Sequence, residues 1–315
     1  MYNEEQKSAF LTATYPNEAK RGEIAGLFAL FAPYEETWGI DLVLQHIDKL
    51  QPAFDEIVET ITPSKAKRIL LPALKKYRTW YLTQKPNAIS TGVLLLKLNL
   101  EGKLRSLMVA SPRHLKLIFD EVFESPERES LDCVYRALLW LAFAGVPRDR
   151  ATLITVDEVD FENMQIHHGG KDYEIHAEGL KEFRKLCTLD YLVYIHRNPD
   201  YEQQRPRVQG DQLLRGYSNT SLNILKICND MTRRFMPTKW ALAYENVQAC
   251  GLYYKKYELE RIGQDVSFNE EAEERLSQMT ESSEAALQIS RNMMRSRYRA
   301  GYRQWKALFN VPEDA

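Results

Sequence analysis

The chain has 315 residues, 44% of them hydrophobic and 27% charged, which is typical of a globular protein and excludes a disordered or fibrous one. No apolar run approaches the ~20 residues that span a bilayer, and the acidic start lacks the apolar core of a secretory signal, so we expect a cytoplasmic protein without a membrane partner. The net charge of −2 argues weakly against DNA binding, although its distribution matters more than its sum.

The N-terminal third predicts helices. Apolar residues recur at helical spacing in residues 21–38 and 39–61, with Pro33 and Pro52 as expected boundaries. Residues 62–85 predict a helix that Thr62 or Ser64 caps and Pro72 kinks. Between Ser64 and Lys85 this helix carries seven basic residues and no acid, which favours contact with phosphates over a solvated face: Lys65, Lys67, Arg68, Lys75, Lys76, Arg78 and Lys85.

The middle of the chain predicts a connection followed by helices and one hairpin. Residues 89–110 are interpreted as a linker. Two strand-like runs, 161–168 and 171–177, flank Gly169-Gly170, a strong signal for a hairpin turn. A polar loop is expected at 197–211, and helices are expected at 111–123, 125–145, 177–197, 220–235 and 244–262.

The C-terminal part combines opposite charges. Residues 270–284 hold six acids, and residues 291–306 hold six basic residues interleaved with Tyr298, Tyr302 and Trp305. The basic run either contacts DNA or pairs with the adjacent acidic run. The four cysteines are scattered without zinc spacing, and no third ligand accompanies His167 and His168, so we expect neither metal nor cofactor.

This order of elements resembles the tyrosine recombinases, the phage-integrase family. The basic run KKYRTW is similar to a Tyr-x-x-Trp helix of that family, and residues 145–160 fit its opening catalytic frame without gaps. The resemblance implies a mainly α fold with a small β-hairpin or sheet. It also implies a helical core-binding domain at 1–88, the linker at 89–110 and a catalytic-type domain at 111–315.

The resemblance further implies a metal-free reaction in which a tyrosine attacks a DNA phosphodiester and becomes joined to the 3′ phosphate. Two arginines neutralise the developing charge, a lysine protonates the leaving oxygen, and a histidine assists the nucleophile. Lys171 matches the hairpin lysine, and Tyr298 or Tyr302 stands where the nucleophile belongs. Pro147 and Gln248 replace the two arginines, Glu245 replaces the histidine, and Arg148 lies one residue from the first arginine position.

Three hypotheses follow. The first is a DNA-binding protein of this fold, associated with a phage or mobile element, whose catalytic set is impaired; it binds double-stranded DNA through the basic helix and Arg150. The second is an active, diverged site-specific recombinase that uses Tyr298 or Tyr302 with Lys171 and Arg148. The third is a helical interaction module without DNA binding, which the pI near 6.4 favours. The resemblance also implies a possible homo-oligomer through the C-terminal helix.

Overall fold

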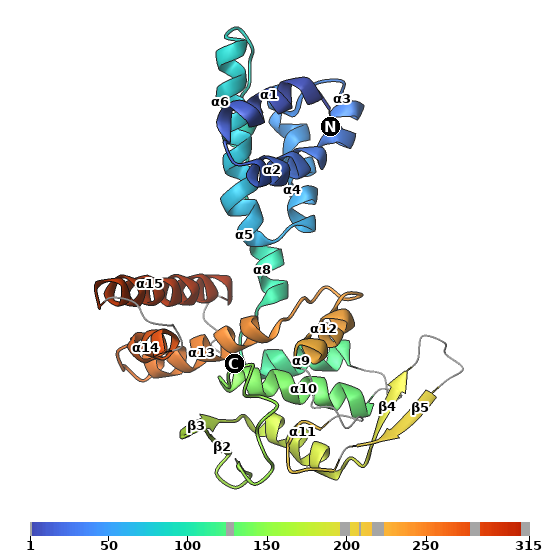
Figure 1. Cartoon of the computed structure of the whole chain (residues 1–315), viewed down its shortest axis with the longest axis vertical. Coiled ribbons are helices and arrows are strands. Elements are labelled where there is room, and N and C mark those ends of the chain that lie inside the picture. Colours follow the sequence, from blue (N-terminus) through green and yellow to red (C-terminus); the bar gives the residue numbers. More distant parts are fainter. Residues whose placement is uncertain are drawn as a thin grey trace. The chain divides into compact units, whose positions relative to one another are not determined.

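The computed structural model describes residues 2–123, 129–195, 202–207, 209–215, 224–277 and 284–309. Over these residues the chain is mainly helical, with one three-stranded and one two-stranded antiparallel sheet, which confirms the predicted fold class of helices with a small sheet (Figure 1). The chain forms two compact units, Met1–Leu104 and Arg105–Ala315. Each unit has its own hydrophobic core.

The N-terminal unit packs short helices around aromatic side chains. Tyr77 lies at the centre, with its ring centroid 5.1 Å from that of Phe10 and 5.3 Å from that of Phe28. Its hydroxyl donates to Asp41 over 2.8 Å, which satisfies a buried polar group. The helices are α1 (Glu4–Thr14), α2 (Glu18–Ala29), α3 (Ala32–Trp38), the 3-10 turn η1 (Leu42–Leu44), α4 (Ile47–Thr60), α5 (Pro63–Lys65), the π turn η2 (Ala66–Leu70), α6 (Leu71–Gln84) and α7 (Gly92–Leu95).

The prolines have different effects in this unit. Pro72 lies in the first turn of α6, directly after the π turn η2, so the predicted interruption of the basic helix is present. Pro52 lies inside α4, and the predicted boundary there is wrong. The α4 helix continues because its buried residues, among them Phe54 and Val58, anchor it to the core.

The segment 89–110, expected as a linker, contains α7 and α8 (Glu101–Leu107). Val93 and Leu96 are buried in the N-terminal core. Gly92 is required at its position, because an added Cβ would lie 2.2 Å from the carbonyl oxygen of Gln45. Much of this segment therefore packs as part of the N-terminal unit.

The C-terminal unit is built around α10 (Glu129–Phe143), in which every residue from Asp132 to Ala142 is buried. The α11 and α13 helices pack against α10. At Gly251 of α13 an added Cβ would meet the carbonyl oxygen of Phe143 at 1.9 Å, so this glycine allows close packing. The other helices are α9 (Pro112–Val122), α11 (Ala177–Thr188), α12 (Ile224–Phe235), α13 (Tyr244–Arg261), α14 (Asn269–Ser277) and α15 (Glu284–Phe309).

The predicted hairpin is present as β2 (Gln165–His168) and β3 (Lys171–Glu174), and β1 (Val159–Asp160) extends it to three strands. His168 pairs with Lys171 across the turn. Gly169 and Gly170 have φ of 61° and 74°, the left-handed values that a type I′ turn requires. The hairpin thus holds Lys171 at the first position after the turn.

The expected helix over 177–197 ends early. The α11 helix stops at Thr188, and β4 (Tyr191–Ile195) pairs with β5 (Glu202–Pro206), which lies in the expected polar loop. The prediction failed because the apolar run 191–195 is short enough for either a helix or a strand. Residues 197–201 and 208 of the expected loop lie outside the described residues.

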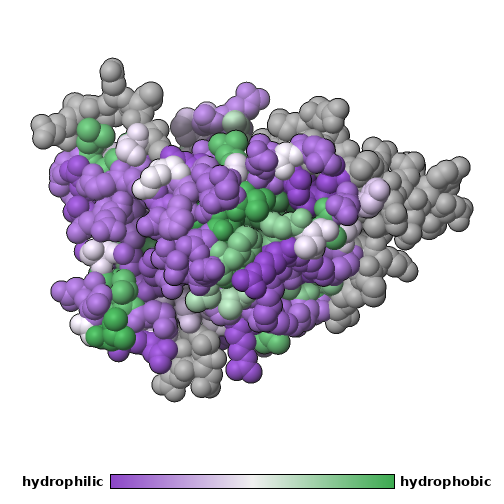
Figure 2. Space-filling view, turned by 90° about the horizontal axis from the view of Figure 1, so that it is seen from below, coloured by the Kyte–Doolittle hydropathy of each residue, from purple (hydrophilic) through white to green (hydrophobic). Residues whose placement is uncertain are grey.

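The surface is mostly hydrophilic where Figure 2 shows it. Seen from below, apolar side chains gather near the centre of the face, smaller apolar groups lie nearer its edges, and hydrophilic residues surround them. No described helix combines the length and apolar character that a membrane span needs.

Candidate functional site

Hydrogen bonds join the loop after α10 to the start of α13. They bring together positions that the family resemblance predicts to be catalytic. Gly145 ends α10 with φ of 95°. The Tyr244 hydroxyl donates to the Val146 carbonyl over 2.9 Å. The Gln248 amide nitrogen donates to the carbonyls of Gly145 and Val146, each over 3.0 Å. An amide nitrogen has two N–H donors, so these two bonds use both of them.

Arg148 stands beside this junction and forms an ion pair with Glu245. Their side chains are 41% and 56% exposed, so water and salt screen the pair. Cys228 of α12 lies within electrostatic reach: burial raises the pKa of its thiol, the charge of Glu245 raises it further, and that of Arg148 lowers it. The arginine nearest to the position where the resemblance predicts the first catalytic arginine is therefore already bound by a carboxylate.

Arg150 lies against the turn of the hairpin. An added Cβ at Gly169 would come within 2.8 Å of its Nη1 atom, so a side chain at Gly169 would displace the guanidinium. Burial raises the pKa of the Tyr173 hydroxyl, and the charges of Lys171 and Arg150 counteract this shift. Lys171 and Arg150 thus flank Tyr173 at the same end of the sheet.

The Lys171 ammonium forms an ion pair with Glu274 of α14 over 2.5 Å, with both side chains about 40% exposed. Tyr298 of α15 faces the same helix. Its ring stacks on Phe268, with the ring centroids 5.8 Å apart and an interplanar angle of 11°. Burial raises the pKa of the Tyr298 hydroxyl. The charge of Arg275 lowers this pKa, and the charges of Glu271 and Glu274 raise it. Lys171 and Tyr298 therefore lie around one acidic helix.

Tyr302 is placed differently. Its ring is buried, and its hydroxyl donates to Glu260 over 2.5 Å. Lys306 binds the same carboxylate over 2.8 Å. Burial and the bond to Glu260 both raise the pKa of the Tyr302 hydroxyl, which opposes formation of a nucleophilic phenolate.

The basic helix presents its cations to solvent. Residues at spacings of three and four bury one side of the helix: Ala66, Leu70, Ala73, Leu74, Tyr77 and Tyr81. Lys65 and Arg78 are partly exposed, and Arg78 donates to the Ser90 carbonyl over 2.6 Å. None of the seven cations forms an ion pair with a residue that the structure describes. Five are exposed: Lys67, Arg68, Lys75, Lys76 and Lys85.

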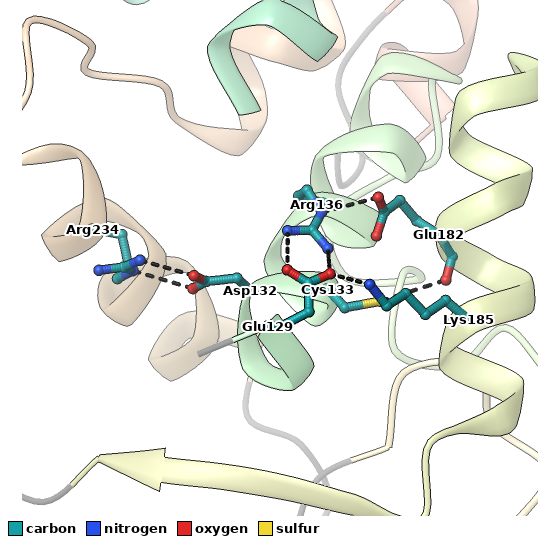
Figure 3. Close-up of polar contacts among 7 residues, drawn as sticks. All are labelled: Glu129, Asp132, Cys133, Arg136, Glu182, Lys185 and Arg234. Carbon is teal, nitrogen blue, oxygen red and sulfur yellow. Dashed lines mark hydrogen bonds and ion pairs between the residues drawn. The ribbon is translucent and has the colours of Figure 1, made fainter. Parts of the chain in front are cut away.

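A second polar cluster, around α10, was not predicted from the sequence (Figure 3). Arg136, whose side chain is 8% exposed, binds Glu129 over 2.5 Å and Glu182 over 3.0 Å. Asp132 is fully buried and binds Arg234 of α12 through both carboxylate oxygens, at 2.8 and 3.2 Å. Two charges inside an otherwise apolar run were the available signal.

This cluster ties α10 to its neighbours. Glu129 also binds Lys185 of α11, and the Cys133 thiol donates to the Glu182 carbonyl over 3.6 Å. Burial raises the pKa of the Cys133 thiol to about 12, so this cysteine is not a nucleophile. Arg136 and Glu129 border a pocket of about 330 Å³. Because each charged group has a partner on an adjacent element, the cluster is structural.

The two neighbouring histidines are also engaged. The His167 ring approaches Asp172 at 2.7 Å, and the His168 ring approaches Glu158 at 2.9 Å. Among the described parts of the chain, no group of three or more histidine, cysteine or acidic residues is arranged to hold a metal ion.

The chain was compared with known proteins. No protein-family model and no curated protein matches it. Among solved structures it is similar to the crystal structure of XerA recombinase, with a TM-score of 0.35 and 13% sequence identity, over 95% of this chain and 98% of that one.

Proposed function

We propose that the chain binds double-stranded DNA without cleaving it. The observation that carries this proposal is the basic helix from α5 to α6, whose seven cations have no carboxylate partner among the described residues. In this proposal the N-terminal unit has the role of a core-binding domain and the C-terminal unit is a tyrosine recombinase-like domain with an impaired catalytic set. An association with a phage or mobile element, and a homo-oligomer through α15, belong to the same proposal.

Electrostatics supports the choice of DNA as the partner. Each cation that neutralises a DNA phosphate releases condensed counterions, and the logarithm of the binding constant falls with log salt by about 0.9 per contact. Contacts from four of the exposed cations give a slope of about −3.6. A solvated face that only maintains solubility binds no phosphate and produces no such slope.

The second part of the proposal concerns chemistry. In the transition state the negative charge lies on the non-bridging phosphate oxygens, and guanidinium groups are strong donors for stabilising it. Here Pro147 offers none, Gln248 is bonded to backbone carbonyls, and Arg148 is paired with Glu245. The loss of one strong donor typically lowers the rate of the chemical step by ~10²–10³. A site that lacks both arginines should therefore show almost no turnover.

The test is fluorescence anisotropy with a labelled duplex of mixed sequence, between ~50 and ~200 mM salt. We expect binding that weakens steeply with salt. Charge reversal of Lys67, Arg68, Lys75 and Lys76 should lower the affinity by ~100-fold or more and flatten the slope.

The control reverses Lys116 and Lys181, which are exposed but already paired with Asp120 and Glu178. This control should change the affinity by less than about threefold, since these cations already have carboxylate partners. Absence of wild-type binding at the lowest salt would remove the proposal and leave the interaction module as the leading function.

One observation favours an active recombinase as the second candidate. Lys171 and Tyr298, a general acid and a nucleophile in that chemistry, both lie around Glu274. A nicked suicide duplex distinguishes the two candidates, because an active enzyme accumulates a covalent adduct that Tyr298→Phe abolishes.

A further inference from the structure

The α15 helix has two different long faces in its C-terminal half. One face anchors the helix: Tyr302, Trp305 and Leu308 are buried, and the Trp305 indole donates to the Val109 carbonyl over 2.8 Å. Another face lines an open groove of about 440 Å³. Its lining residues follow one another at helical spacing: Asn292, Arg295, Ser296, Arg299, Ala300 and Arg303.

The composition of this groove is unusual for a solvated helix face. Arg295, Arg299 and Arg303 recur every four residues, while the small side chains of Ser296 and Ala300 lie between them. Among the residues that the structure describes, no acid lines the groove. The three guanidinium groups therefore border a shallow floor that a bulky anion can approach closely.

The acidic helix α14 leaves this face open. Glu273 binds Arg291, which lies one helical turn before Arg295, and Glu260 binds Lys306. Glu273 reaches Arg295 only at 3.9 Å, and the Arg295 Nε atom is buried without a hydrogen-bond partner. Within the described residues, Arg299 and Arg303 have no ion pair. The expected neutralisation of the basic run by the acidic run is thus limited to part of α15.

The spacing of the arginines fits a polyphosphate. Four residues of α-helix rise about 6 Å, so successive guanidinium groups are about one helical turn apart. One strand of duplex DNA presents a phosphate about every 3.4 Å along the axis, so each arginine can bind a separate phosphate. Guanidinium binds phosphate through two parallel N–H donors, and the Asn292 amide and Ser296 hydroxyl add neutral donors.

We infer that the Asn292–Arg303 face of α15 is a second DNA-binding surface, which holds the phosphate backbone of one strand. The inference rests on the proposed function and extends it to the C-terminal unit. It assigns α15 to DNA contact, independently of whether Tyr298 can react.

The test compares two charge reversals on the same helix. Arg299→Glu/Arg303→Glu changes the groove, whereas Arg297→Glu changes an exposed arginine outside it. The double variant should bind the duplex at least about tenfold more weakly, and its salt slope should be shallower by about 2. Arg297→Glu should weaken binding by less than about threefold, because its charge acts only at long range.

A second variant separates charge from folding. Arg299→Lys/Arg303→Lys keeps both charges and should retain most of the slope, while losing some affinity with the bidentate geometry. Circular dichroism and thermal unfolding should be unchanged for all these exposed positions.

The outcomes separate the two claims. In the first outcome, the wild type binds DNA, charge reversal in α6 abolishes binding, and Arg297→Glu weakens binding as much as the groove variant does. This outcome overturns the inference about the groove and leaves the proposed function intact. No wild-type binding overturns both. Selective loss in the groove variant, restored by lysine, supports the inference.

Discussion

Among the described residues, the lysines and arginines of α6 and of the turns before it have no carboxylate partner, whereas Arg148 near the start of α13 and Lys171 beside α14 each have one. Arg148 holds Glu245, and Lys171 holds Glu274. A phosphate can bind the first set directly. To bind the second set it must displace a carboxylate of the same chain, so the net gain is smaller. We therefore expect cations of this chain to differ in their capacity to bind phosphate according to their intramolecular partners.

The largest expected effect is a loss of stability when a buried cation of the N-terminal unit is removed from its carboxylate partner. Lys7 and Glu35 are fully buried and joined over 2.5 Å. Lys7→Ala leaves a buried carboxylate alone and should cost about 3–5 kcal/mol of unfolding free energy, measured in urea. The matched change Lys67→Ala, on the exposed face, should cost less than about 0.5 kcal/mol.

The order of the two variants should be reversed in DNA binding, where Lys67→Ala should have the larger effect. Lys67→Ala should make the salt slope shallower by about 1, since one phosphate contact is lost. Lys7→Ala should leave the slope unchanged in the folded population. Equal slopes for wild type and Lys67→Ala would break the comparison.

The two candidate nucleophiles should differ in stability. Tyr302→Phe removes a bond to the Glu260 carboxylate and should cost about 1 kcal/mol. Tyr298→Phe removes a hydroxyl with no hydrogen bond to the described residues and should cost less than about 0.5 kcal/mol. Urea denaturation followed by tryptophan fluorescence measures both. A larger cost at Tyr298 would contradict the assignment of Tyr302 as the structural tyrosine.

The comparison can also be tested by freeing a paired cation, Arg148, from its carboxylate partner. Glu245→Gln removes the carboxylate charge and frees the guanidinium, so DNA should bind roughly two- to fivefold more tightly, with a slope steeper by about 1. Glu178→Gln, which removes a paired carboxylate on α11, is the control. Unchanged affinity in Glu245→Gln would show that DNA does not reach the junction.

The smallest expected effect is a dependence of stability on pH. Burial, followed by the charges of Arg105 and Lys239, lowers the pKa of His114, and its Nδ1 atom accepts the Ala110 N–H over 3.0 Å. Since the folded pKa lies below the unfolded value of about 6.5, the stability is complete above that pH and declines as the pH falls below it.

Thermal unfolding between about pH 7 and pH 5 should therefore show a modest loss in the wild type. His114→Gln keeps an acceptor without a titrating group and should show a smaller loss over the same range. Parallel curves for the two proteins would contradict the role of His114. Carboxylates such as Glu260, whose pKa Lys306 and Tyr302 lower, act at more acidic pH.

The sequence predicted the features that depend on local chemistry. Gly169-Gly170 determines the turn of the type I′ hairpin. The helical class with a small sheet is confirmed for the same reason. These predictions need only a few neighbouring residues.

The features that depend on distant residues could not be predicted. The run 191–195 forms a strand because β5 pairs with it, and Pro52 remains helical because the core holds α4. The partners of Arg148, Lys171 and Tyr302 come from helices that lie about 40 to 100 residues away in sequence. The family resemblance indicated these positions but not the carboxylates that bind them.

One nicked, labelled suicide duplex tests the central claim most directly, because the same sample reports both binding and cleavage. The account predicts saturable binding that salt reverses, and no protein–DNA adduct on a denaturing gel from the wild type, Tyr298→Phe or Tyr302→Phe. A wild-type adduct that disappears in either variant would show that the site cleaves DNA despite its occupied cations, and would contradict the account.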